Sequence, residues 1–543
     1  GTVNGVGISS NISNFTSSIL ISNDAGTGTL SSANYNTGLG WEVFDDLTSG
    51  DNNVGLGYQA LTKLTTGSGN HGIGRTALEK NTTGSENTAV GNNALNANTT
   101  ASNNTAVGSS ALVANTVGHS NTAVGYETGK ALTTGDNNIA IGYRALYKED
   151  TGNRSVAIGD FALHEQNNDD SNYNVGVGYA AGTAITTGIK NTCIGGLAGD
   201  AITTASNNTA VGYASLTSNT TGTPNTAFGY AALTSCTTGG SNVAVGKGAA
   251  DAVTTGGSNT AIGTDALSTA TTTSRNTAVG KSALELNTAS DNVAVGYNCL
   301  DNCTSGSNNT AVGTECMDAN TTGSGNVAMG YRTLDANTTG SSNVAIGQYA
   351  LSDNTTAGGN TAVGYAALTD CTTGDSNTAV GFEAVEKTTT GIHNTGVGYR
   401  ANFTGTTGSY NVSLGNFTND AITTGNENVS LGYGAGSAIT TGGDNVSIGN
   451  SAGNITTGSF NTMIGGDTAG NSATANNQNV FGFGVSGETG YTTLGLTSSD
   501  IRAQHGVATW ATVSDRRVKK DIEDSTAGLS FINDLRPRTF NYK

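Results

Sequence analysis

The chain has 543 residues, of which 80 are Gly and only 2 are Pro, and its formal net charge is −18. This composition excludes a collagen triple helix. No apolar run approaches the roughly 18 residues of a membrane span. The acidic balance without a basic stripe argues against nucleic acid as a partner, so we expect neither nucleic-acid binding nor membrane insertion. Because the sequence begins at Gly1 without a Met or a signal peptide, we expect a processed or incomplete product.

Residues 1–35 precede any regular pattern and are predicted to form an irregular leader or cap. Over residues 36–482 a short motif then recurs, first as NTGLG at position 36 and last as QNVFG at 478. It occurs 27 times at a spacing of 17 residues, interrupted by one spacing of 19 and two of 16. If the first motif residue is offset 0, offset 4 is always Gly and offset 3 is always apolar. Such regularity predicts one structural unit stacked many times.

Each repeat is predicted to form one coil of a parallel β-solenoid, or β-roll, in an all-β fold of about 27 coils. Seventeen residues are too few for a helical hairpin, and β-branched residues punctuated by Gly and Asn favour strands and turns. We expect one strand on offsets 1 to 5, a turn at the fixed Gly, a second strand near offsets 6 to 9 and a return turn through T-T-G. Gly67, Gly84 and Gly135 are expected to supply positive φ in the return turn.

A compensating pair of positions predicts the core. Offset 8 is usually Leu or Met and offset 11 is usually Asn or another small or polar residue. In six coils the order inverts, and the branched residue at offset 11 is Leu132, Ile185, Ile202, Val253, Ile422 or Ile439. A close-packed interior is therefore expected to admit one such residue per coil, Leu61 with Leu64 being the exception. The small residues at offsets 2 and 7 are left to pack elsewhere, which predicts a homotrimeric fibre.

The Asn column at offset 0 is predicted to form hydrogen bonds along the solenoid axis. The same architecture explains the recurring N-T-T sequons at Asn81, Asn98, Asn219, Asn320, Asn337 and Asn354 better than glycosylation does. The six cysteines replace small residues and are predicted to be free thiols, since they have neither zinc-type nor disulfide-type spacing. These are Cys193, Cys236, Cys299, Cys303, Cys316 and Cys371. We expect no metal and no cofactor.

An aromatic column stands at offset 5. It includes the candidate binding residues Tyr213, Tyr230, Tyr297, Tyr331 and Tyr365. Polar residues such as Arg75 and Lys247 replace the aromatic residue in other coils, which predicts that the column is at least partly in contact with solvent. Two interpretations are open: a ladder that stacks on glycans, or a ladder that packs coil on coil or chain on chain.

The C-terminal part of the chain differs in composition. Residues 483–513 are predicted to form a β-rich stem that contains Trp510, and 12 of the last 30 residues are charged. A new domain is therefore predicted over 514–543. Taken alone, Ser514 or Asp515 would cap a short helix in which Lys519 is solvated.

Two motifs carry a resemblance to known families. The repeat N-T/V-A-V/I-G, followed by a small-Leu pair, resembles the coils of YadA-like trimeric autotransporter adhesin heads and of many phage tail fibres. The C-terminal S-D-x-R-x-K-x-x-I and I-x-x-L-x-P-x-x-F-x-Y resemble the start of the intramolecular chaperone, self-cleaving domain of tail fibres, tailspikes and endosialidases. A complete domain of that kind is expected to have on the order of a hundred residues. The resemblance implies that Ser514 attacks the Val513 carbonyl and that Lys519 is the general base.

These features predict a homotrimeric phage tail fibre or similar virion appendage, which would be extracellular. Its expected partners are other virion tail proteins and a host-cell surface glycan or protein receptor. Self-cleavage at Val513/Ser514 would be its only chemistry, since no carboxylate pair or Ser/His/Asp group recurs as in an enzyme acting on an external substrate. A bacterial cell-surface trimeric adhesin and a receptor-free structural filament are the alternatives.

Overall fold

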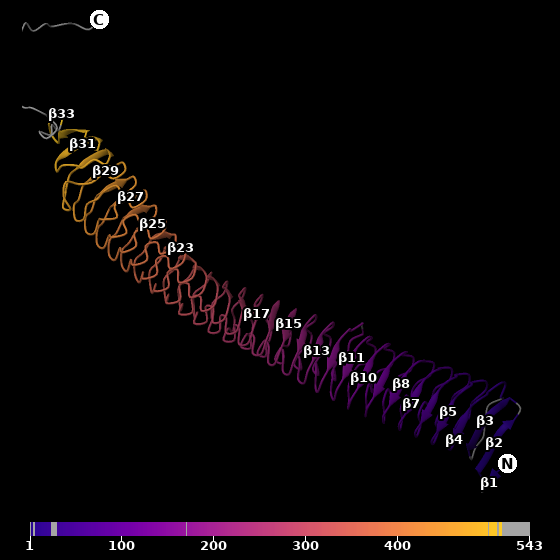
Figure 1. The fold of residues 1–543 in the computed structure, drawn as a ribbon. Coiled ribbons are helices and arrows are strands. Elements are labelled where there is room, and N and C mark those ends of the chain that lie inside the picture. The colour runs from indigo at the N-terminus through magenta and orange to yellow at the C-terminus, as the bar shows by residue number, and fades with distance from the viewer. Residues whose placement is uncertain are drawn as a thin grey trace, which may run out of the picture. The chain divides into compact units, whose positions relative to one another are not determined.

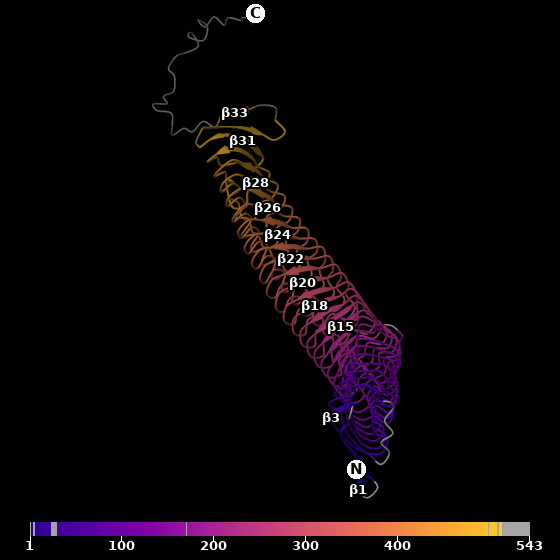
Figure 2. The same cartoon turned by 90° about the vertical axis from the view of Figure 1, so that its right-hand side faces the viewer.

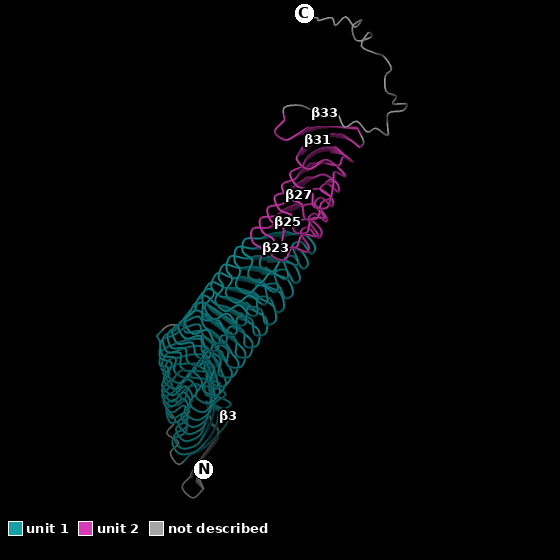
Figure 3. Ribbon diagram, turned by 90° about the vertical axis from the view of Figure 1, so that its left-hand side faces the viewer, with its two compact units in different colours: residues 1–390 teal, residues 391–543 magenta. Residues whose placement is uncertain are grey.

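A computed structural model describes residues 2–3, 6–12, 14–22, 30–169, 171–497, 499–507 and 510–512. The fold is all-β over these residues and divides into two compact units, 1–390 and 391–543 (Figure 3). The described part of the chain contains no helix that is long and apolar enough to cross a membrane.

Strands β1 (Thr2–Val3), β2 (Val6–Ile12) and β3 (Phe15–Ser22) lie in the segment that the sequence predicted to be irregular. Each of the 27 repeats then contributes one short strand. In unit 1 these are β4 (Thr37–Leu39), β5 (Val54–Leu56), β6 (His71–Ile73), β7 (Thr88–Val90), β8 (Thr105–Val107), β9 (Thr122–Val124), β10 (Ile139–Ile141), β11 (Val156–Ile158), β12 (Val175–Val177), β13 (Thr192–Ile194), β14 (Thr209–Val211), β15 (Asn225–Phe228), β16 (Asn242–Val245), β17 (Thr260–Ile262), β18 (Thr277–Val279), β19 (Val293–Val295), β20 (Thr310–Val312), β21 (Val327–Met329), β22 (Val344–Ile346), β23 (Thr361–Val363) and β24 (Thr378–Val380). In unit 2 they are β25 (Thr395–Val397), β26 (Val412–Leu414), β27 (Val429–Leu431), β28 (Val446–Ile448), β29 (Thr462–Ile464) and β30 (Asn479–Phe483), followed by β31 (Tyr491–Leu496), β32 (Ser499–Gln504) and β33 (Trp510–Thr512).

Within each unit the repeat strands stack on one another (Figures 1 and 2), and they pair in parallel and in register. In β7 and β8, Thr88, Ala89 and Val90 face the residues that stand 17 positions later. The strands before and after the repeats reverse direction, because β2 pairs antiparallel with β3 and β31 with β32. The predicted parallel β-solenoid of about 17-residue coils is confirmed.

The predicted strand pattern within a coil is wrong in two respects. In most coils the first strand covers offsets 1 to 3 instead of 1 to 5, because it ends before the fixed Gly, and offsets 6 to 9 form turns instead of a second strand. Only β30 covers offsets 1 to 5 as predicted. In the coil that begins at Asn87, Asn93 and Leu95 have φ of 58° and 49°. This left-handed geometry lets two consecutive side chains, Ala94 and Leu95, both be fully buried. A strand cannot do this, since its successive side chains point to opposite faces.

The glycine at offset 14 has a different role from the one expected. Gly67, Gly84 and Gly135 do not have positive φ. A side chain on Gly84 would instead meet the carbonyl oxygen of Ala101, which stands at the same offset in the next coil. Gly at this offset therefore serves a close approach between coils and not a left-handed conformation, although the fully buried Ala101 occupies the same offset. Positive φ belongs to the offset-4 glycines, such as Gly91 at 142°.

The interior of each coil is built from offsets 2, 7, 8 and 11. Ala89 at offset 2 and Ala94 at offset 7 are fully buried in their own chain. The prediction that these small residues pack between chains is therefore wrong. The side chain at offset 3 is half-buried or exposed in all 27 coils, so it is this residue and not the small ones that faces away from the core.

The inverted coils confirm that offsets 8 and 11 share one volume. All six branched residues predicted to fill it from offset 11 are fully buried. A Cβ added to Gly182 would lie 2.9 Å from Cδ1 of Ile185, and one added to Gly199 would lie 2.8 Å from Cδ1 of Ile202. Offset 8 must therefore shrink when offset 11 supplies the side chain.

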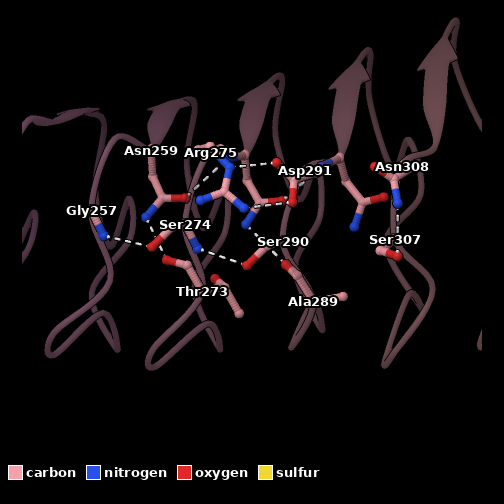
Figure 4. Close-up of polar contacts among 12 residues, drawn as sticks. Gly257, Asn259, Thr273, Ser274, Arg275, Ala289, Ser290, Asp291, Ser307 and Asn308 are labelled. Atoms are coloured by element: carbon pink, nitrogen blue, oxygen red, sulfur yellow. Dashed lines mark hydrogen bonds and ion pairs between the residues drawn. The ribbon is translucent and has the colours of Figure 1, made fainter.

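The Asn column forms the predicted hydrogen-bonded ladder. Asn53 Nδ2 donates to Asn36 Oδ1 at 3.0 Å, and Asn70 Nδ2 donates to Asn53 Oδ1 at 3.1 Å. Figure 4 shows the adjacent edge of the coils, where Ser274 N donates to Ser290 Oγ at 3.0 Å and Arg275 forms an ion pair with Asp291. The six sequon asparagines are fully buried, so folded coils offer no room for a glycan there.

Candidate functional site

The predicted self-processing residues Ser514 and Lys519 lie outside the described residues. The last described strand, β33, pairs antiparallel with β32 and ends at Thr512. The site that the structure does present is the aromatic column.

All five candidate tyrosines are exposed. Between 40% and 57% of the surface of Tyr213, Tyr230, Tyr297, Tyr331 and Tyr365 is accessible to solvent. Offset 5 directly follows the fixed Gly, and that Gly ends the strand and turns the chain away from the core. The tyrosines therefore stand where the coil turns, and the prediction that the column is in contact with solvent is confirmed.

Rings in successive coils contact one another. The centroids of Tyr126 and Tyr143 are 5.7 Å apart with planes 9° from parallel, and those of Tyr213 and Tyr230 are 5.8 Å apart with planes 15° from parallel. Such offset stacking stabilises adjacent coils, as the packing interpretation requires. Part of each ring face is covered by its neighbour, while the remaining exposed area is available to a ligand.

Three further aromatic residues at offset 6 make the column more continuous than its offset-5 residues alone predict. Phe161, Tyr349 and Phe417 occur in coils whose offset 5 is Asp160, Gln348 and Asn416 respectively. They are the only aromatic residues at offset 6, and both neighbouring coils of each have an aromatic residue at offset 5. Reading offset 5 together with offset 6 would have found them.

Each of these rings bridges the gap on both sides. Phe161 lies 5.2 Å from Tyr143 and 6.4 Å from Tyr179 between ring centroids. Tyr349 and Phe417 make the same edge-to-face contacts with their neighbours. The result is three aromatic runs: Tyr126–Tyr143–Phe161–Tyr179, Tyr331–Tyr349–Tyr365–Phe382 and Tyr399–Phe417–Tyr433.

Charged groups accompany the first run. The Arg144 guanidinium lies 5.1 Å from the centroid of the Tyr143 ring and 5.2 Å from that of Tyr147. Glu127 accepts hydrogen bonds from Lys130 at 2.7 Å and Arg144 at 2.8 Å. The bond from Lys130, reinforced by that from Arg144, lowers the pKa of Glu127. Lys130, Arg144 and Glu127 thus form a group of ion pairs beside these rings.

The cysteines are free and buried, as predicted. Cys236, Cys303 and Cys371 take the place of Asn at offset 11. The Sγ atom of each lies 3.2 to 3.4 Å from the carbonyl oxygen at offset 14 of its own coil. In a coil with Asn at offset 11, Asn81 Nδ2 donates to the corresponding carbonyl oxygen. Burial raises the pKa of Cys193 to about 12, so this thiol is unsuited to nucleophilic chemistry. Among the described residues no three His, Cys, Asp or Glu side chains group as metal ligands would.

Comparison with protein-family models finds a match at the C-terminal end of the chain. Residues 514–543 match the family described as chaperone of endosialidase. The match begins at Ser514 and does not include the repeats. Comparisons with curated proteins and with solved structures give no match.

Proposed function

We propose that the chain is the solenoid shaft of a homotrimeric phage tail fibre or similar virion appendage, and that it attaches the virion to a host-cell surface. The observation that carries the proposal is the order of two parts along the chain. A long in-register β-solenoid is followed by a segment that matches the chaperone of endosialidase. A chaperone at the C-terminus suits a fibre whose identical chains must associate before they fold together. Other virion tail proteins would be its structural partners.

The outward face of the repeat strands supports association of chains. Leu39, Ile73, Phe228 and Met329 at offset 3 are exposed in the single chain, and every coil places an apolar residue there. Contiguous exposed apolar surface of this kind marks a protein–protein interface. A second and a third copy of the same chain are the partners that match a stripe repeated in every coil.

Self-cleavage before Ser514 is the only chemistry that we propose. The Ser514 hydroxyl would attack the Val513 carbonyl, and Lys519 would accept its proton if neighbouring cations or burial lower the pKa of that lysine. The peptide C–N bond between Val513 and Ser514 would break as an ester forms, and water would then hydrolyse the ester to leave a free carboxylate on Val513. The test expresses the complete gene as wild type and as Ser514→Ala, and compares the denatured chains by mass. We expect a chain ending at Val513 within a trimer for wild type and an uncut chain for the variant. Identical fragments from both would refute the assignment, and an uncut monomer from wild type would remove the trimer as well.

The aromatic column is proposed to contact a host glycan. Tyr213 and Tyr230 are stacked and more than half exposed, so their ring edges and hydroxyls remain open to a ligand. Many identical weak contacts along a fibre would add up through multivalency. Replacing both tyrosines by Ala is expected to weaken binding to host cells while the mass of the trimer stays the same. Unchanged cell binding would leave these two tyrosines with a packing role only.

A further inference from the structure

A surface hollow lies in unit 2, at the second of the two 16-residue coils. That coil runs from Asn445 to Phe460 and lacks one residue between its offset-8 glycine, Gly453, and the buried Ile455. The other short coil loses its residue in the T-T-G turn instead, so its offset-8 position is an ordinary buried Leu284. The missing residue therefore shortens the surface of the coil at this one place.

Small residues keep the hollow open. Gly434 and Gly453 line it, and its volume is about 280 Å³. Gly453 has φ of 81° and no room for a side chain, since a Cβ there would meet the Ser447 hydroxyl. Pockets for drug-sized ligands measure about 300 to 1,000 Å³. The hollow therefore suits one small ring.

Polar side chains without partners line the hollow. Ser437, Asn454 and Asp467 belong to three successive coils, and none of their side chains forms a hydrogen bond with the described residues. Behind Gly453 the buried Ser447 hydroxyl also lacks a partner among the described residues. Hydroxyl, amide and carboxylate groups together can both donate to and accept from the hydroxyls of a sugar. The lining residues include one carboxylate and no Lys or Arg, which disfavours an anionic ligand.

An aromatic run leads to the hollow along the coils. Phe417 lies 5.1 Å from Tyr399 and 5.8 Å from Tyr433 between ring centroids. Tyr433 is exposed and directly precedes Gly434 of the hollow. Phe417 stands at offset 6 of its coil. In the two coils that follow the coil of Tyr433, offset 6 is Ser451 and Asp467, and both of these residues line the hollow. Aromatic rings followed by polar groups along one row match a chain of sugars, whose C–H faces pack on rings and whose hydroxyls form hydrogen bonds.

We propose that this hollow binds the terminal ring of a neutral hexose oligosaccharide, with the following sugars packed along Tyr433, Phe417 and Tyr399. The inference rests on the proposed attachment function, because it names the chemistry of the receptor and the part of the fibre that contacts it. It assigns the terminal sugar to Asp467, Asn454 and Ser437, which the sequence alone did not single out.

The test measures binding of uncharged hexamers of glucose, galactose and mannose to the purified protein by saturation-transfer NMR and titration. Hexagalacturonate is the charged counterpart. At least one neutral hexamer is expected to bind, and hexagalacturonate to bind at least tenfold more weakly, because Asp467 repels its carboxylates. Asp467→Asn keeps a residue that tolerates the φ of 53° at this site and is expected to weaken the neutral hexamer about tenfold. Ala438→Phe, which fills the hollow, is expected to abolish binding.

Asp444→Asn is the matched control, since Asp444 has φ of 57° in the same unit, is exposed and does not line the hollow. Absence of binding by all neutral hexamers would overturn the inference, as would unchanged binding by Asp467→Asn and Ala438→Phe or equal binding of hexagalacturonate. The mass of each preparation is measured in parallel. If the protein is an uncut monomer that binds the hexamer, the sugar site in the hollow stands and the proposed trimeric fibre is refuted. If it is a cut trimer that does not bind the hexamer, the fibre stands and the sugar site is refuted.

Discussion

Val43 and Gly55, on successive coils, share one place in the core. A Cβ added to Gly55 would lie 2.7 Å from Cγ1 of Val43. Eleven of the 27 coils have Ala at both of these offsets, 2 and 7. Here the larger Val43 and the ring of Phe44, both fully buried, take the space that Gly55 leaves. In the first coils a larger residue in one coil is thus compensated by a smaller one in the next coil. Offsets 8 and 11 compensate each other in the same way within one coil.

Gly55→Ala is therefore expected to lower the free energy of unfolding by about 1 to 3 kcal/mol through overpacking. Val43→Ala alone removes two buried methyl groups and is also expected to destabilise. The double variant restores the common Ala–Ala pair, so its loss is expected to be clearly smaller than the sum of the two single losses. Thermal midpoints of the four proteins measure this coupling. Strict additivity would contradict the shared-volume argument.

The sequence predicted the elements that depend on spacing alone. In-register stacking, the Asn ladder and the filling of one volume by Leu112 or by Leu132 all follow from repeated offsets. The second strand was wrong, because the sequence does not reveal that Ala94 and Leu95 both turn inward through left-handed backbone. Phe161 was missed because an aromatic residue one position away can still reach its neighbours across a turn. The hollow was not predicted, because the sequence shows that one coil lacks a residue but not which part of the coil surface recedes as a result. Only the three-dimensional packing of the coils determines that.

A ladder of carboxylates is expected to make stability depend on pH. Asp301, Asp318 and Asp335 stand at offset 9 of three successive coils, with Glu285 preceding them. Burial, followed by the charge of Asp318, raises the pKa of Asp301 and of Asp335 to about 6. Burial also raises the pKa of Asp318 itself. Other charges that act on these carboxyls are those of Glu315, Arg332 and Asp353.

Since the folded pKa values lie above the unfolded value of about 3.8, the folded state holds these protons more tightly. Their contribution is complete below about pH 4 and is lost as the pH rises through about 6. Asp318→Asn keeps the side-chain oxygen that accepts from the Ala319 amide and removes the central charge. Its thermal midpoint is expected to exceed that of wild type at pH 8 and to match it at pH 4. Parallel pH profiles for the two proteins would refute this account.

The buried thiols are expected to resist alkylation in the folded protein. Burial raises the pKa of Cys236, Cys303 and Cys371 to about 11. The thiolate fraction at pH 8 then falls about 100-fold relative to an exposed cysteine, and the reagent also lacks access. Iodoacetamide at pH 8 is expected to modify no cysteine before denaturation and all six in urea, as measured by intact mass. Rapid labelling of the native chain would show that coils open locally.

Glu149 connects the coils where the repeat lengthens to 19 residues and Ser155 replaces the ladder Asn. Gln166 Nε2 donates to Glu149 Oε2 at 2.9 Å and to Ser155 Oγ at 2.7 Å. Asn172 Nδ2 donates to Glu149 Oε2 at 2.9 Å, and Gly152 N donates to Oε1 at 2.7 Å. Burial raises the pKa of Glu149, and the bonds from Gln166 and Gly152 oppose the rise.

Because all these partners are N–H donors, both carboxylate oxygens are needed as acceptors. Glu149→Gln places an amide N–H against one of the donors and is expected to lower the free energy of unfolding by about 1 to 3 kcal/mol, although it removes a buried charge. Glu86→Gln, the same change at an exposed position, is the control and is expected to leave stability within about 0.5 kcal/mol of wild type. Urea midpoints compare the three proteins. A more stable Glu149→Gln protein would mean that burial of the charge outweighs its hydrogen bonds, and that the interrupted ladder is held by Gln166 and Ser155 alone.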